Sequence, residues 1–211
     1  MSGWIYNITQ LENSAWTIEK GPDINEPVAN HVSIIQDGTS LSLLMCELYR
    51  YAGWLAKHIE PICAFPTSLS FNYELLIDIP TLECAQVIET DIKATNSRGL
   101  TFDGSVQFNI AEGWEIQVGD PWFYTGVKIP PLDPYKYYDI TLEHDFSDAR
   151  RASKLCKVFI NDTKYEIPEH WVEASQVGWT VNELVLQLQQ VNNHNAGGYT
   201  LNFRDIGISY T

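Results

Sequence analysis

A strict alternation of polar and apolar residues is the feature that most limits how this chain can fold. It is clearest from Gln86 to Ile110 (QVIETDIKATNSRGLTFDGSVQFNI), which predicts two strands joined by a loop. Successive side chains of a strand point to opposite faces of its sheet, so one face of this pair packs on a core and the other meets solvent or a ligand. The side chains predicted to share the outward face are Val87, Glu89, Asp91, Lys93, Ser105, Gln107 and Asn109.

Similar short segments, separated by turn signals such as Asp37-Gly38, recur along the chain. Many strands with almost no helix predict an all-β fold, a two-sheet antiparallel sandwich. The further predicted strands are Gly3 to Gln10, Ser14 to Glu19, Val32 to Gln36, Ser68 to Ile79, Gly113 to Gly119, Tyr137 to His144, Lys157 to Ile167, Glu183 to Val191 and Tyr199 to Tyr210.

Residues 41–59 allow two interpretations. An apolar stripe that includes Leu41, Leu44 and Leu48 has helical spacing. The alternative is two strands, Leu41 to Met45 and Tyr51 to His58. We favour strands, because the surrounding segments are all β and no capping box precedes the stripe.

Composition narrows the classes of partner. The chain has 211 residues, which suits a single sandwich domain over 1–211, and its formal net charge is −14. Such acidity disfavours nucleic acid and anionic membranes as partners. The amino terminus has no basic and apolar leader, so we expect a cytoplasmic protein, or a secreted one if a leader is missing from the sequence. The oligomeric state stays open.

The cysteines give no sign of a metal centre. Four are scattered along the chain, with no CxxC motif and no short cysteine–histidine spacing. We therefore expect free thiols, no metal and no cofactor.

The order of the later segments, YELLIDIP, VIETDI, VQFNI, GWEIQV and FRDIGISY, resembles the concanavalin A-like jelly roll. This superfamily includes legume-type lectins, laminarinase-type endoglucanases and polysaccharide lyases. The resemblance covers roughly two-thirds of the chain, from Ser68 onward, and implies a jelly-roll sandwich. One such fold hosts many activities, so the resemblance does not assign a function.

Two motifs of this superfamily can be compared with the sequence. The laminarinase-type enzymes carry Glu-x-Asp-x-Glu on one strand; Glu89 and Asp91 match the first two places, but Lys93 stands at the third. Retaining hydrolysis needs a second carboxyl group that protonates the leaving oxygen, and a lysine replaces it poorly. Legume-type lectins hold calcium with a similar Glu-x-Asp strand, but the downstream Asn96 and Asp103 have the wrong spacing.

If the predicted strands pair in the jelly-roll order, their polar sides combine into one concave surface. A plain water-facing sheet is the simpler interpretation. The amides and nearby aromatic residues instead favour a ligand site, with Trp122 and Tyr124 in an irregular aromatic loop that stacks on the ligand. Trp114 is expected to pack in the core. The predicted ligand-binding residues are Glu74, Gln107, Asn109, Trp122, Tyr124, Asp139, Thr141 and Arg204, and the wider surface adds Asn72, Lys93, Glu143, Gln187, Gln189 and Asn202.

Two functions fit this surface. The first is a binding protein for a glycan, or for another polyol or organic ligand. The alternative is an intracellular enzyme, such as a cyclase, isomerase or lyase, which acts on a small metabolite through acid–base catalysis by Glu89 and Asp91.

Overall fold

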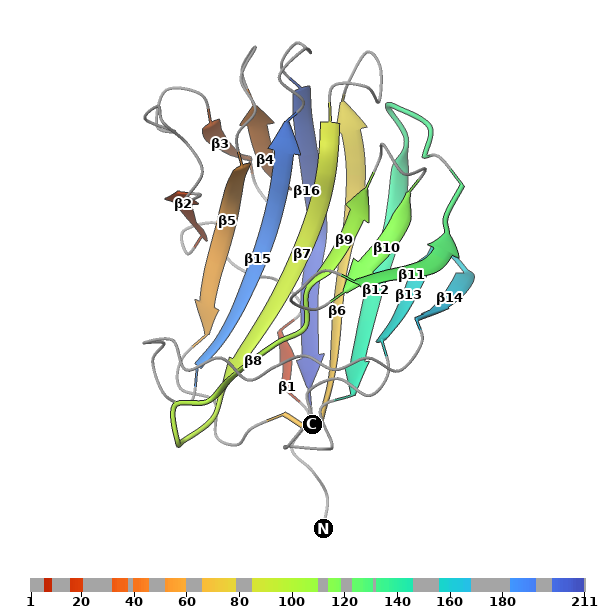
Figure 1. Cartoon of the computed structure of the whole chain (residues 1–211). Helices are drawn as coiled ribbons and strands as arrows, with labels where there is room; N and C mark the ends of the chain where they lie inside the picture. Colours follow the sequence, from red (N-terminus) through yellow and green to blue (C-terminus); the bar gives the residue numbers. More distant parts are fainter. Residues whose placement is uncertain are drawn as a thin grey trace.

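The computed structural model describes residues 6–8, 16–20, 32–37, 40–45, 52–59, 66–78, 85–109, 114–118, 123–130, 132–145, 156–167, 183–192 and 199–210. Within these ranges every regular element is a strand, and the strands form two stacked antiparallel sheets (Figure 1). The predicted all-β, two-sheet sandwich is therefore confirmed.

The back sheet of Figure 1 contains the strands β1 (Tyr6–Ile8), β3 (Val32–Asp37), β4 (Ser40–Met45), β6 (Ser68–Asp78), β12 (Tyr137–Asp145), β13 (Cys156–Ile160), β14 (Thr163–Ile167) and β16 (Tyr199–Tyr210). Their order is β14-β13-β12-β6-β16-β4-β3, and β1 pairs with β16.

The front sheet contains β2 (Trp16–Lys20), β5 (Ala52–Ile59), β7 (Ala85–Thr95), β8 (Thr101–Asp103), β9 (Val106–Asn109), β10 (Glu115–Val118), β11 (Phe123–Lys128) and β15 (Glu183–Asn192). Its order is β11-β10-β9-β7-β15-β5-β2, and β8 pairs with β7. The chain crosses from one sheet to the other between β6 and β7, whereas β12, β13 and β14 follow one another within the back sheet.

The ambiguous segment 41–59 contains two strands, β4 and β5, so the favoured interpretation is confirmed. The predicted hairpin of β13 and β14 is also present, with the turn residue Asn161 at a φ of 51°. Asparagine tolerates this left-handed conformation better than most residues. One expectation is wrong: Phe123–Lys128 is not an irregular loop but the edge strand β11.

The central hairpin of the front sheet has the predicted parity. Glu89 pairs with Gln107, and Lys93 pairs with Asp103 in the same register, so β8 and β9 are two parts of one partner strand. The amide of Gly104 bridges the interruption by donating to the carbonyl of Ile92 at 2.8 Å. This continuous register keeps the odd-numbered polar side chains of β7 on one face.

The described core lies between the sheets and is built from the inward-facing side chains of strands such as β6, β7, β9, β12, β15 and β16. Phe71 and Tyr73 from β6, Phe108 from β9 and Phe203 from β16 are each at most 2% exposed. The Tyr73 and Phe203 rings meet edge to face at 5.7 Å. Trp114 is 1% exposed, with its ring 5.5 Å from that of Phe108, which confirms its predicted packing role. Burial of such rings is the main stabilising contribution of a sandwich core.

Candidate functional site

The outward side of the front sheet carries a set of polar side chains, which we call the polar face. Strand register brings them together, because Glu89 lies between Gln107 on one side and Gln189 on the other, while Asp91 lies opposite Gln187. The polar face consists of Glu89, Asp91 and Lys93 on β7, Gln107 and Asn109 on β9, Gln117 on β10, and Gln187 and Gln189 on β15.

Amide side chains dominate one row across this face. Gln117 pairs with Gln107 in register, and Gln107 pairs with Glu89. Directly opposite residues of an antiparallel pair bring their side chains close together. The row therefore surrounds one carboxylate with amides that can both donate and accept hydrogen bonds.

Hydrogen bonds hold the charged groups of the polar face in place. The Gln189 amide donates to Glu89 Oε2 at 2.8 Å. The Lys93 ammonium lies 3.2 Å from Asp91 Oδ2 and donates to Gln187 Oε1 at 2.7 Å. The ammonium is thus fixed between a carboxylate and an amide, and it neutralises Asp91 locally.

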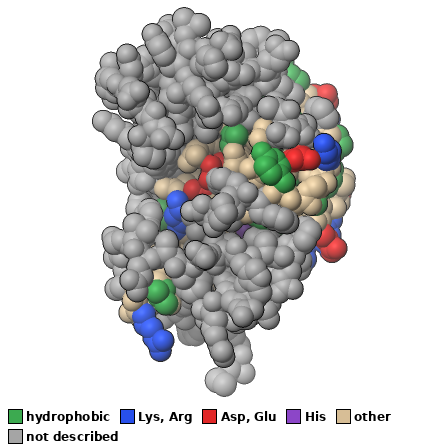
Figure 2. Space-filling view, in the orientation of Figure 1, with side chains coloured by type: hydrophobic (Ala, Val, Ile, Leu, Met, Phe, Trp, Pro, Cys, Tyr) green, Lys and Arg blue, Asp and Glu red, His purple; other side chains and the backbone are tan. Residues whose placement is uncertain are grey.

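Although these groups point away from the core, several of them are buried. Glu89 is 8% exposed, Asp91 4%, Gln117 4% and Gln187 3%. Figure 2 shows acidic side chains near the middle of this side of the molecule. Burial raises the energetic importance of every polar contact here, because water does not replace a missing partner.

Two buried oxygens on the polar face have no hydrogen-bond partner within the described part of the chain. They are Asp91 Oδ1 and Gln107 Oε1. A buried acceptor without a partner typically costs about 1–3 kcal/mol. Such acceptors are places where the donors of a bound ligand would be stabilised most.

Four of the predicted site residues lie elsewhere, which corrects the expected single surface. Glu74, Asp139, Thr141 and Arg204 belong to β6, β12 and β16, which are neighbours in the back sheet. Their polar sides face outward on the opposite side of the sandwich. The alternation along a strand predicts which of its side chains face the core and which face outward. It does not predict which of the two sheets the strand joins.

On the back sheet these residues form contacts among themselves. Arg204 makes an ion pair with Glu74, and its guanidinium stacks over the Tyr137 ring at 3.6 Å from the centroid. The hydrogen bond that Arg204 donates to the Glu74 carboxylate raises the pKa of Arg204 above its usual value. Asp139 lies opposite Glu74 and is exposed. Asn72, Glu143 and Asn202 also lie on back-sheet strands, so the wider predicted surface is divided in the same way.

Of the two aromatic residues predicted to stack on a ligand, Tyr124 and Trp122, the structure describes only Tyr124. Tyr124 lies on β11 opposite Gln117, is 47% exposed, and its hydroxyl is 3.5 Å from the Asn109 amide nitrogen. It therefore borders the polar face, and its stacking role stays a prediction. Trp122 lies outside the described residues.

Gln117 was not among the site residues predicted from the sequence. The signal was present, because Gln117 alternates with the apolar Ile116 and Val118 and therefore faces outward.

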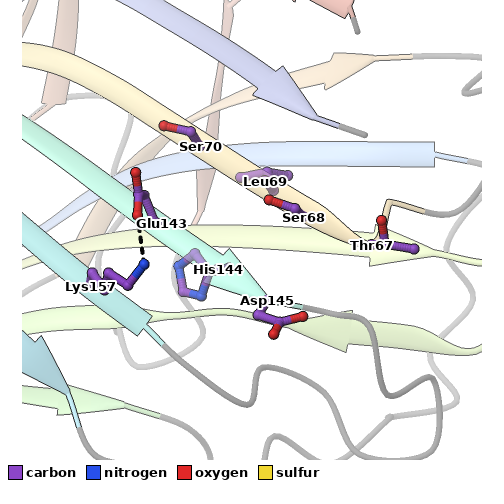
Figure 3. Close-up of a pocket in the computed structure, with 8 residues that line it drawn as sticks. All are labelled: Thr67, Ser68, Leu69, Ser70, Glu143, His144, Asp145 and Lys157. Carbon is purple, nitrogen blue, oxygen red and sulfur yellow. Dashed lines mark hydrogen bonds and ion pairs between the residues drawn. The ribbon is translucent and has the colours of Figure 1, made fainter. Parts of the chain in front are cut away.

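A separate hollow of about 440 Å³ lies on the back sheet, where residues 67–70 of the β6 segment meet the end of β12 (Figure 3). Lys157 and Glu143 border it with an ion pair of 3.2 Å, and the nearby His144 is 2% exposed. This hollow and the polar face are on opposite sheets. We place the candidate site on the polar face, because the buried oxygens without partners lie there.

Among the described residues, no group of three or more His, Cys, Asp or Glu is arranged to hold a metal ion.

No helix in the described part of the chain has the length and apolar character needed to cross a membrane.

Comparison with solved structures identifies the class of fold. The winged bean acidic lectin, complexed with methyl-α-D-galactose, superposes with a TM-score of 0.57 at 12% identity, covering 99% of this chain and 98% of the lectin. The Bacillus licheniformis β-glucanase gives 0.53 at 10% identity, covering 100% and 99%. The endo-β-1,4-glucuronan lyase of Trichoderma reesei gives 0.56 at 10% identity, covering 98% and 95%.

The chain therefore has the concanavalin A-like jelly-roll fold, as its sequence pattern predicted. The sequence matches no family model and no curated protein. At these identities the likeness concerns the fold alone, so function has to be argued from the polar face itself.

Proposed function

We propose that this protein binds a carbohydrate on the polar face without hydrolysing it. The observation that carries the proposal is the position of Lys93, whose ammonium is 3.2 Å from Asp91 and bonded to Gln187. In the Glu-x-Asp-x-Lys sequence of β7 this ammonium occupies the place of a third carboxyl group. A binding surface tolerates a lysine in place of this carboxyl group, whereas acid catalysis does not.

The chemistry of the polar face supports recognition of hydroxyl groups. A sugar hydroxyl both donates and accepts, so it is bound well by neighbouring amides and carboxylates. Glu89 with Gln107 and Gln189 supplies such a mixture in one row. Tyr124 at the border adds an exposed ring on which an apolar sugar face could stack. The fold is shared with a lectin complexed with methyl-α-D-galactose, which agrees with this class of ligand.

The same residues argue against retaining hydrolysis. That mechanism needs two carboxyl groups about 5–5.5 Å apart, one as nucleophile and one as acid. Glu89 and Asp91 supply the first two places of the motif, but Asp91 is engaged by Lys93. A lysine ammonium is a weak acid near neutral pH and does not protonate a leaving oxygen efficiently.

Calorimetric titration of a panel of neutral and acidic oligosaccharides tests the proposal. We expect at least one neutral oligosaccharide to bind, and Asp91→Asn to weaken its binding about tenfold or more, since a hydrogen bond to a charged group is lost. The matched substitution Asp139→Asn lies on the back sheet. If it weakens binding while Asp91→Asn does not, the site is on the back sheet and the proposal is wrong.

A second candidate is the acid–base enzyme suggested by the sequence. The burial of Glu89 and Asp91 favours it, since catalytic acids are typically found in desolvated positions. Incubation with oligosaccharides and with small polyols, followed by proton NMR, would detect a product. Conversion by the wild type that Glu89→Gln abolishes would support this candidate, and would replace binding alone as the function.

A further inference from the structure

The unpartnered oxygens of the polar face restrict the class of ligand further. Asp91 Oδ1 and Gln107 Oε1 are both acceptors, and both are buried without a partner in the described part of the chain. Asp91 forms an ion pair with Lys93, and a carboxylate in an ion pair only accepts hydrogen bonds. A ligand that satisfies this atom has to present a donor to it.

The two acceptors are close enough for one ligand to reach both. Gln107 lies opposite Glu89, and Asp91 is two residues further along the same face of β7. Diagonal neighbours of this kind are about 7–8 Å apart at their Cα atoms, and long side chains bring their ends closer. A single ring that bears several hydroxyl groups can bridge such a pair.

The Lys93 ammonium does not give the polar face a preference for anionic ligands. Its ammonium already contacts Asp91 Oδ2 at 3.2 Å and donates to Gln187 Oε1 at 2.7 Å. These two contacts engage two of its three N–H groups, and the Asp91 carboxylate already balances its charge. A ligand carboxylate has no hydrogen-bond donor for Asp91 Oδ1, so it would leave this buried acceptor without a partner.

We infer that the polar face selects polyols that present hydrogen-bond donors, neutral sugars above all, and rejects uronates, with Asp91 as the residue that sets this choice. The inference rests on the proposed carbohydrate binding and adds the charge class of the ligand. It separates this chain from a fold relative named as a glucuronan lyase, since glucuronan is a uronate polymer.

Matched pairs of oligosaccharides that differ only at carbon 6 provide the test. Tetramers of β-1,4-linked glucose and of galactose are titrated beside their C6-oxidised counterparts, in which each CH₂OH is a carboxylate. We expect the neutral member of a bound pair to bind at least about tenfold more tightly than the uronate, because the uronate lacks the hydroxyl donor at carbon 6 and one hydrogen bond to a charged group is lost. Glucosamine oligomers, whose ammonium is also a donor, are expected to bind at least as tightly as the neutral tetramers.

Two variants test whether Asp91 sets the preference for neutral sugars over uronates. Asp91→Asn removes the charge at nearly constant size, and we expect the neutral-to-uronate ratio to fall toward one. Asp162→Asn makes the same change at an exposed turn residue and should leave the ratio unchanged. Thermal unfolding of each variant confirms that it is folded.

The outcomes are distinct. Tighter binding of a uronate than of its neutral partner would overturn the inference, although carbohydrate binding would stand. A neutral preference that persists in Asp91→Asn would also overturn it, because another group would then set the choice. Absence of binding by every oligosaccharide would refute the proposed function and the inference with it.

Discussion

The hydroxyl groups of Tyr73 and Thr90 lie 2.8 Å apart and join the two sheets across the core. Both side chains are buried, at 2% and 0% exposed. Thr90 stands between Glu89 and Asp91 in β7, so this contact lies directly behind the polar face. It fixes the strand that carries the candidate site against β6 of the back sheet.

Removing one partner of this contact should destabilise the fold. Tyr73→Phe leaves the Thr90 hydroxyl buried without a partner, which is expected to cost about 1–2 kcal/mol of unfolding free energy. Tyr73→Phe combined with Thr90→Val removes both polar groups and should recover part of that loss. Urea denaturation measures both effects. If the two substitutions are simply additive, the hydroxyls do not interact.

Alkaline pH should weaken the same contact. Burial raises the pKa of Tyr73 from 10.0 to about 12. Below pH 10 the tyrosine is neutral in both states, so its contribution is fully present. Between pH 10 and about 12 the unfolded chain loses a proton that the folded chain keeps, which lowers the free energy of unfolding by up to about 3 kcal/mol.

Comparison of wild type with Tyr73→Phe isolates this effect from the other tyrosines. The wild type should be more stable than the variant at pH 8. Its advantage should shrink above pH 10 and then reverse. Urea denaturation at several pH values between 8 and 11.5 measures the difference in unfolding free energy between the two proteins. A difference that stays constant with pH would show that burial does not raise the pKa of Tyr73.

The local parts of this structure follow from the sequence, while the pairing of distant strands does not. Glu89 and Gln107 belong to one hairpin, so alternation and a short loop are enough to predict that they share a face. Glu74 alternates just as clearly, but its strand joins the back sheet through β12 and β16. Those partners lie far along the chain, and nothing in the local pattern of β6 selects them.

The strand β11 was not predicted from the sequence, for a different reason. Its segment contains Gly126 and is followed by two prolines, which is typical of a loop. In the structure Gly126 has a φ of 72°, and the pairing of β10 with β11 shifts register between Glu115 and Gln117. The glycine allows a bulge that an ordinary residue would strain, so the strand continues to Lys128.

A second bulge predicts a substitution that the fold tolerates poorly. At the shift between Arg204 and Gly207 in β16, an added Cβ on Gly207 would lie 2.8 Å from Asn72 Oδ1. Asn72 also donates from its amide nitrogen to the carbonyl of Asp205 at 3.1 Å. Gly207→Ala should therefore displace the Asn72 side chain and cost about 1 kcal/mol, the worth of a hydrogen bond.

The partner substitution Asn72→Ala checks this account. It removes the atom that the new methyl group would meet, so Gly207→Ala should cost less in that background. A double-mutant cycle by urea denaturation gives the coupling. Equal costs of Gly207→Ala with and without Asn72 would mean that the backbone, not the amide, resists the methyl group.

The ion pair of Lys93 with Asp91 supports both the stability and the proposed function of the polar face. The Lys93 side chain is 18% exposed and that of Asp91 is 5% exposed. Lys93→Met would leave a buried carboxylate without its cation, which is expected to cost about 3 kcal/mol. Asp91→Asn added to Lys93→Met removes the stranded charge and should restore much of the loss. A double variant that is less stable than Lys93→Met would contradict this pairing.

Lys93→Glu tests the functional side of the same pair, because it completes the Glu-x-Asp-x-Glu sequence. We expect a loss of stability at least as large as in Lys93→Met, since a third carboxylate would lie beside Asp91 without the ammonium. We also expect no hydrolysis of neutral β-glucans, as measured by the release of reducing sugar. The Gln187 amide that holds Lys93 would have to turn its donor toward the new group, and nothing described there would orient an acid. Hydrolysis by Lys93→Glu would show instead that the rest of a catalytic site is already in place, and that Lys93 alone keeps this sandwich a binding protein.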